Sequence, residues 1–188
     1  MRKDSGINSI KDIKGKVVGT NGGGLVRYDG GAWTTVDSRV GLPNDLVMGI
    51  AEVRGPNGRR QLWVGTHGGG VAWADLDARK PEWRSLSSAT TPAIASDIVY
   101  QIRQDHAGRI YLYTNRGIDR LTPRKPSASD PAEFSVYTFT ADDGLPSSEC
   151  NSPAALVDSR GRVWAGTGEG AAVLDPETEI PAGEPRTV

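Results

Sequence analysis

Two glycine-rich runs are the first residues in this 188-residue sequence whose composition suggests chemistry: residues 19–24 (GTNGGG) and residues 65–70 (GTHGGG). A phosphate-binding loop is followed by a helix whose first N–H groups hold the phosphate, and it usually carries a Lys with a Ser or Thr. Here the next residues, from Leu25 and from Val71, are typical of strands. We therefore predict tight turns between strands, where glycine permits positive φ and close backbone approach.

The histidines and acidic residues form no recognisable catalytic or metal-binding pattern. His67 and His106 are the only histidines, and a zinc site needs three or four ligands that no nearby Cys or His spacing supplies. The acidic pair Asp142-Asp143 precedes a glycine, as in a turn, and does not resemble a calcium loop. We predict no catalytic residue, no metal and no cofactor in this chain.

Three side chains are the candidates for contact with a ligand: Trp73, His67 and Asn115. Trp73 departs from the pattern of the other aromatic residues, because its nearest counterpart in the first repeat is Tyr28. His67 and Asn115 each follow a threonine in a repeated turn motif. For Trp73 the competing interpretation is packing, since large aromatic side chains bury 150–250 Å² each.

These residues sit in a repeat. A threonine recurs at positions 20, 66, 114 and 167, at intervals of 46, 48 and 53 residues. The spacing is close to the ~40–50 residues of a four-stranded propeller blade. Trp63, Tyr111 and Trp164 occupy one equivalent place ahead of these threonines, where we expect them to pack between blades.

The surroundings of each threonine repeat as well. A turn with glycine and a basic residue precedes it and an apolar strand follows it, which indicates strand, turn, strand, glycine turn, strand, turn, strand. No segment has the period of a helix, so the predicted class is all-β, with about four propeller blades. The predicted blades span residues 7–42, 43–94, 95–143 and 144–176, the fourth without its outer strand, and residues 177–188 form a polar tail.

Charge and composition exclude several partners. The chain has 22 Lys and Arg against 23 Asp and Glu, so nothing favours nucleic acid or an electrostatic membrane attachment. No stretch approaches the ~20 apolar residues of a membrane span, and no signal peptide is visible. Cys150 is the single cysteine, and we expect a buried apolar role for it.

The combination of residues 41–45 (GLPND), the Gly-Arg turns, residues 62–66 (LWVGT) and the glycine runs resembles the two-component regulator propeller repeat. The resemblance covers about residues 7–176. It implies a periplasmic or extracytoplasmic sensor module that recognises a carbohydrate or other small ligand. Its output domain, a histidine kinase, hybrid regulator or diguanylate cyclase, would lie outside this chain.

Two other functions remain open on the same scaffold. One is a propeller enzyme, such as a lyase or glycoside hydrolase, and the other is a platform for protein interaction or dimerisation. Four open blades would also leave sheet edges and faces uncovered. We expect one of three solutions: a segment of a longer propeller, self-association of two copies into a ring of about eight blades, or a four-bladed ring.

Overall fold

The computed structural model describes residues 17–28, 31–127 and 133–178, and within them fourteen strands form four antiparallel sheets. Each sheet is built from consecutive strands, and we call the sheets blades 1 to 4 in chain order. Blade 1 holds β1 (Val17–Gly19), β2 (Leu25–Tyr28) and β3 (Trp33–Val36). Blade 2 holds β4 (Val47–Arg54), β5 (Arg60–Thr66), β6 (Val71–Asp75) and β7 (Arg84–Leu86).

Blade 3 holds β8 (Val99–Gln104), β9 (Ile110–Thr114), β10 (Gly117–Pro123) and β11 (Phe134–Phe139). Blade 4 holds β12 (Cys150–Val157), β13 (Val163–Thr167) and β14 (Gly170–Leu174). The prediction of an all-β chain made of four repeated sheets is confirmed. In the described residues it needs one addition, the short 3-10 helices η2 (Ser38–Val40) and η3 (Ala141–Asp143) in two connections between blades.

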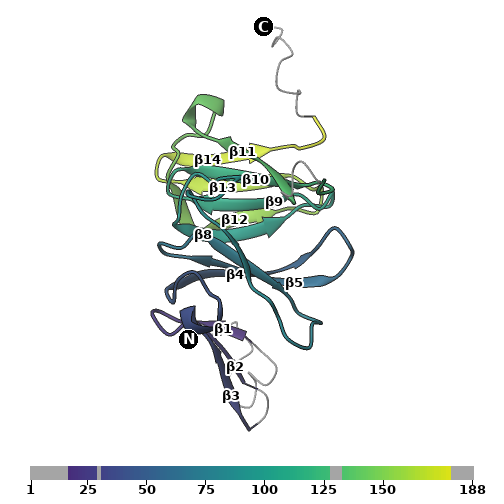
Figure 1. Cartoon of the computed structure of the whole chain (residues 1–188). Helices are drawn as coiled ribbons and strands as arrows, with labels where there is room; N and C mark the ends of the chain where they lie inside the picture. The colour runs from purple at the N-terminus through teal and green to yellow at the C-terminus, as the bar shows by residue number, and fades with distance from the viewer. Residues whose placement is uncertain (1–16, 29–30, 128–132, 179–188) are drawn as a thin grey trace, which may run out of the picture.

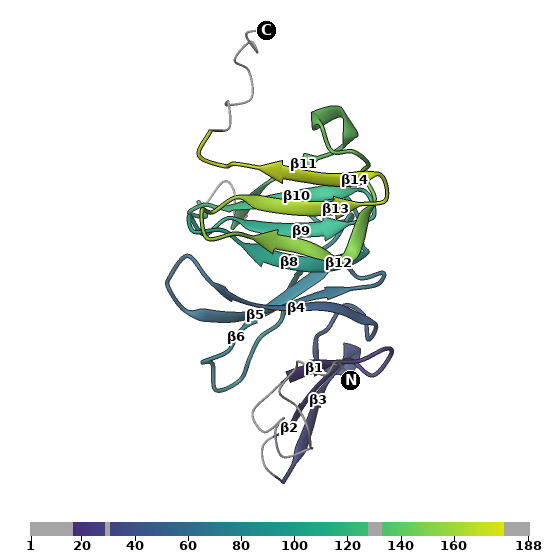
Figure 2. The same cartoon turned by 180° about the vertical axis from the view of Figure 1, so that it is seen from behind.

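The blades stack face to face in chain order, from blade 1 at one end to blade 4 at the other (Figures 1 and 2). The first strands of blades 2, 3 and 4 approach one another, β4 against β8 and β8 against β12. The stack is therefore closest along the edge formed by these strands, which we call the inner edge. This is the wedge-like arrangement that the repeat predicts.

Side chains between the blades form the core. Alternate residues of a strand point to opposite faces, so each blade has a forward face toward the next blade and a rear face toward the preceding one. On the forward face of blade 2, Ala51, Trp63 and Trp73 lie side by side in register. They pack against residues of blade 3 that include Ile102 and Leu112.

Two glycines show why the repeated motif requires this residue. A Cβ on Gly65 would lie 2.5 Å from the carbonyl oxygen of Val99, in the inner strand of the next blade. Gly70 has φ +73° and ends the turn before β6, where a Cβ would meet the Leu86 carbonyl oxygen. The predicted tight turns with close backbone approach are thus confirmed, and a strand follows each of them.

Blade 3 has Tyr113 where the other blades have glycine at the position of Gly65. The Tyr113 side chain is buried and its hydroxyl donates to the carbonyl oxygen of Trp164 in blade 4, at 3.1 Å. Burial raises the pKa of this phenol. A large side chain therefore fills the space between blades 3 and 4 that backbone occupies between blades 2 and 3.

Parts of the predicted division fall outside the described residues. The beginning of the first predicted blade lies in residues 1–16, and most of the predicted tail lies in residues 179–188. In blade 4, β14 is the last strand of the described chain. The predicted loop of residues 123–131 lies in the connection from β10 to β11 and includes residues 128–131, which are not described.

Candidate functional site

The stack has two chemically different ends. At one end lie the repeated glycine turns, which join β1 to β2, β5 to β6, β9 to β10 and β13 to β14, together with the connections between blades, and we call it the glycine-turn end. At the other end lie the hairpins between the first and second strands, such as residues 55–59, which we call the hairpin end. His67 and Asn115 lie at the glycine-turn end, each directly after the threonine that ends its strand.

The turns at the glycine-turn end are held by repeated hydrogen bonds. The Thr66 hydroxyl donates to the Gly70 carbonyl oxygen and accepts from the Gly69 amide, and Thr20 makes the same pair of bonds in blade 1. Thr114 and Thr167 likewise donate to the glycine that opens the next strand. The threonine therefore holds the turn closed.

His67 and Asn115 meet different surroundings at this shared position. His67 is exposed, and its backbone amide donates to the Leu46 carbonyl oxygen in the preceding connection. Asn115 is half-buried, and its side-chain oxygen accepts from the Ser96 hydroxyl at 2.6 Å. The structure thus places both predicted residues at the same end of the stack, in neighbouring blades.

Acidic residues at this end accept hydrogen bonds within the connections between blades. Asp45 accepts hydrogen bonds from the amide and hydroxyl of Ser38, and Asp97 does the same for Ser88. The backbone carbonyl of Asp97 also accepts from Gly68 and Gly70. These carboxylates therefore hold the ends of the connecting loops together.

The connection from blade 2 to blade 3 stands out by its length. The hydrogen-bonded Ser and Asp at its two ends are nine residues apart, against seven in the connection from blade 1 to blade 2. Asp119, fully buried in β10, accepts from the Ala95 amide and from the Thr138 hydroxyl and so anchors this loop. Burial raises the pKa of Asp119. Sequence reasoning missed this loop, although the two extra residues were a visible signal.

Trp73 lies apart from the two turn residues. Its side chain is only 4% exposed and stacks on Trp63, with ring centroids 4.7 Å apart. Phe134 of blade 3 meets both rings edge-on, and the Arg84 guanidinium lies 5.3 Å from the Trp73 centroid. This is the environment that the packing interpretation predicts, and it does not join Trp73 to a surface with His67 and Asn115.

The hairpin end is built from a different repeated device. Asp105 in blade 3 accepts from the amides of Ala107 and Arg109, pairs with the Arg109 side chain, and accepts from the Tyr111 hydroxyl at 3.1 Å. Asp158 in blade 4 does the same for its own turn, including the Trp164 indole N–H at 3.0 Å. The donors around it, first the Trp164 N–H, lower the pKa of Asp158 to about 2.

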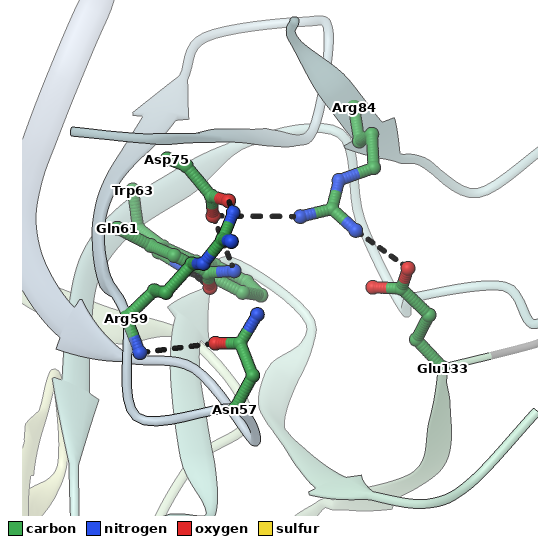
Figure 3. A network of polar contacts seen from close by, with 7 residues as sticks. All are labelled: Asn57, Arg59, Gln61, Trp63, Asp75, Arg84 and Glu133. Atoms are coloured by element: carbon green, nitrogen blue, oxygen red, sulfur yellow. Dashed lines mark hydrogen bonds and ion pairs between the residues drawn. The ribbon is translucent and has the colours of Figure 1, made fainter. Parts of the chain in front are cut away.

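Blade 2 replaces this aspartate with a larger network (Figure 3). Its turn has the same length as in blade 3, with Gly55 at the place of Asp105, but the strands on both sides of the turn are longer, at 8 and 7 residues against 6 and 5. The Trp63 indole N–H donates to Gln61, whose amide donates in turn to Asp75 at 3.1 Å. The Arg59 guanidinium also donates to the Asp75 carboxylate, and the Asn57 side-chain oxygen accepts from the Arg59 amide in the turn.

The same network extends across the gap to blade 3. Arg84 lies between Asp75 of its own blade and Glu133 of blade 3, with both carboxylates within ion-pair distance (Figure 3). A shallow depression of about 390 Å³ lies near this end, lined by Arg54, Pro56, Gln104, His106 and Pro123 among others. Gln104 in its wall bonds both the amide and the carbonyl of Arg54, so these polar groups are already used to join the blades.

Among residues 17–28, 31–127 and 133–178, no group of three or more His, Cys, Asp or Glu side chains is arranged to hold a metal ion. Cys150 is buried, and burial raises the pKa of its thiol to about 11. None of the helices in the described part of the chain has the length and apolar character needed to cross a membrane.

No family model matches this chain, and no curated protein matches it. Solved structures do match. The extracellular domain of a protein described as a hybrid two component system of B. thetaiotaomicron is 24% identical, with a TM-score of 0.59 over 88% of this chain. The extracellular domain of a one component system of the same organism is 23% identical, with a TM-score of 0.62 over 87%.

A third matching structure belongs to a secretion system. PorZ, a surface component of the type-IX secretion system of Porphyromonas gingivalis, is 15% identical with a TM-score of 0.54 over 87% of this chain. The chain spans 22% of the length of each of the two B. thetaiotaomicron domains and 26% of PorZ. At these identities the likeness concerns the fold. The chain thus has the fold of a part of extracellular domains from bacterial sensor systems.

Proposed function

We propose that this chain is the ligand-recognising part of a bacterial extracytoplasmic sensor, and that a small polar ligand of the carbohydrate class binds at the glycine-turn end. The observation that carries the proposal is the structural likeness to extracellular domains of two sensor systems. A sensor module of this kind requires a binding surface and no catalytic groups.

The chemistry of the two ends supports the choice of surface. At the hairpin end, Asp105 and Asp158 are committed to their own turns, arginines and aromatic rings. At the glycine-turn end, the residue after the repeated threonine is not constant: it is asparagine in blades 1 and 3 (Asn21 and Asn115), His67 in blade 2 and Gly168 in blade 4. Variable side chains on a repeated scaffold are how repeat proteins form binding surfaces.

The two candidate residues suit a neutral polar ligand. An exposed imidazole can donate and accept hydrogen bonds, and the half-buried Asn115 amide retains donors while its oxygen accepts from Ser96. Hydroxyl-rich ligands are recognised by such groups because each hydroxyl both donates and accepts. The loop that carries Ser96 is the long connection of residues 87–98, which lies at the same end of the stack.

The test is calorimetric titration with a panel of soluble oligosaccharides. For a sugar that binds, His67→Ala and Asn115→Ala should each weaken the affinity by about fivefold to tenfold, the value of one or two hydrogen bonds. His106→Ala is the matched control, because His106 is also exposed but lies at the hairpin end. Equal effects of His67→Ala and His106→Ala would contradict the proposed surface, and release of a cleaved product would favour an enzyme.

A further inference from the structure

The forward face of blade 4 exposes an apolar row. Leu156, Trp164 and Val173 lie side by side in register across the blade's three strands. Leu156 is 54% exposed and Val173 50%, while Trp164 is half-buried. In Figure 2, blade 4 lies in front of blade 3 and no other strand crosses it. Apolar residues that lie together on an exposed face mark an interaction surface, whereas apolar residues scattered singly need no such explanation.

The same row in the other blades is a packing surface. In blade 2 the corresponding residues are Ala51, Trp63 and Trp73, and blade 3 covers them. In blade 3 the corresponding row contains Tyr111, fully buried against blade 4 residues that include Cys150 and Val163. The position therefore defines what fits on the face of blade 4, namely the rear face of another blade.

Within the described residues, the rear face of blade 1 also carries an exposed apolar residue. Val18 in blade 1 pairs with Val26 in register and is 41% exposed. Its counterparts on the rear faces of blades 2 and 3 are Val64 and Leu112, and both are fully buried. Blade 1 and blade 4 therefore carry the two complementary halves of one blade-to-blade contact.

We propose that two copies of this chain associate head to tail, with blade 4 of each copy packed on the rear of blade 1 of the other. A two-fold axis makes both contacts identical and leaves neither face uncovered, whereas a head-to-tail contact that does not close would extend into a filament. The arginine that stacks on Trp164, Arg162 at 5.2 Å, is no obstacle. The covered row of blade 3 also includes arginines, Arg103 and Arg120.

The experiment is sedimentation velocity of the full chain over a concentration series. The wild type should reach twice the 20.0 kDa mass of one chain. Leu156→Glu and Val18→Lys should each shift the midpoint of dimerisation to at least tenfold higher concentration. Val40→Lys is the matched control, because Val40 is 58% exposed but lies in η2, away from both rows, and it should leave the midpoint unchanged.

Mixing Leu156→Glu with Val18→Lys makes the test independent of any effect on folding. In a mixed dimer one contact is wild type on both sides. The other contact brings the introduced carboxylate of the first variant toward the introduced ammonium of the second, so association should return.

Two results would overturn the proposal. One is a wild type that stays at 20.0 kDa at every concentration. The other is a dimer that Leu156→Glu breaks and Val18→Lys does not, because it would show blade 4 packed on itself.

Discussion

Trp63 and Trp164 occupy the same place in blades 2 and 4, yet their surroundings differ in two respects. Trp63 is fully buried beneath blade 3, whereas Trp164 faces outward from the last described blade. The Trp63 indole N–H donates to the neutral amide of Gln61, and the Trp164 indole N–H donates to the charged carboxylate of Asp158.

The comparison shows how one position in the repeat can serve as core or as surface. The strand, the register and the ring are the same in both blades, and only the covering blade decides how much apolar area leaves water. The acceptor type does not follow burial, because the fully buried Tyr111 of blade 3 also donates to a carboxylate, that of Asp105.

The largest expected difference concerns the rings themselves. Trp63→Ala should lower the free energy of unfolding by about 3–5 kcal/mol, because a fully buried ring and its contacts with Trp73 and Phe134 are lost. Trp164→Ala should cost about 1–2 kcal/mol, since less of that ring leaves water on folding. Denaturant titration of both variants at a chain concentration below the midpoint of dimerisation measures the difference, and equal losses there would contradict the assignment of Trp164 to a face that is uncovered in the single chain.

The next largest effect concerns the hairpin of blade 2, where Gly55 stands at the position of the aspartate of blades 3 and 4 and Gln61 accepts from the tryptophan N–H instead. Gly55→Asp should destabilise by about 1–3 kcal/mol, because its Cβ would lie 2.8 Å from the Gln61 amide nitrogen. Gln61→Ala should cost a similar amount by leaving the buried Trp63 N–H without its acceptor.

The double variant Gly55→Asp/Gln61→Ala should cost less than the sum of the two single changes. Removing the amide clears the space, and the new carboxylate can cap the turn as Asp105 does in blade 3. The measurement is a double-mutant cycle by denaturant titration. Strictly additive losses would mean that Gln61 does not occupy the place of the missing aspartate.

A smaller effect is the dependence of stability on pH. It should distinguish Asp158, the ionisable acceptor of the Trp164 N–H, from Gln61, the neutral acceptor of the Trp63 N–H. The pKa of Asp158 is lowered in the folded chain from its ordinary value of 3.8 to about 2, first by the Trp164 N–H. A lowered carboxyl pKa stabilises the fold above about pH 4, and this contribution is lost as the pH falls toward about 2.

Melting temperatures measured between about pH 5 and about pH 2 test this behaviour. Asp158→Asn should lower the melting temperature at the upper end of that range and make its fall with acid less steep. Asp142→Asn, a change at an exposed turn residue of η3, is the control and should leave the wild-type curve in place. The neutral Gln61 in blade 2 adds no titration of its own.

The smallest expected effect belongs to the ion pair that joins blades 2 and 3 at their outer strands. Glu133→Gln removes the charge that faces Arg84, but both side chains are more than a third exposed. The expected loss is below about 1 kcal/mol and should shrink further in high salt. A loss as large as that of Trp63→Ala would show that the polar bridge, and not the stacked rings, holds these blades together.

Much of the fold could be predicted because each blade is a local unit. The recurring threonines, the glycine turns and the aromatic residue ahead of three of the four threonines specify four sheets of consecutive strands without long-range information. The two turn residues proposed as a site, His67 and Asn115, are also local, since their end of the sheet follows from the strand direction. Trp73 shows the limit, because its burial depends on Phe134, 61 residues further along the chain.

The amino-acid sequence by itself determined the class, the repeat and the turns of this protein, because glycine torsions and strand alternation act between neighbouring residues. Only the tertiary structure decided which aromatic rings are covered, which acids are committed to loops, and which faces remain open. Those outcomes depend on how one blade stacks on the next. Trp63 and Trp164 have the same local motif, and the presence of a covering blade separates a core residue from one in the exposed row that we propose as a contact with a second copy.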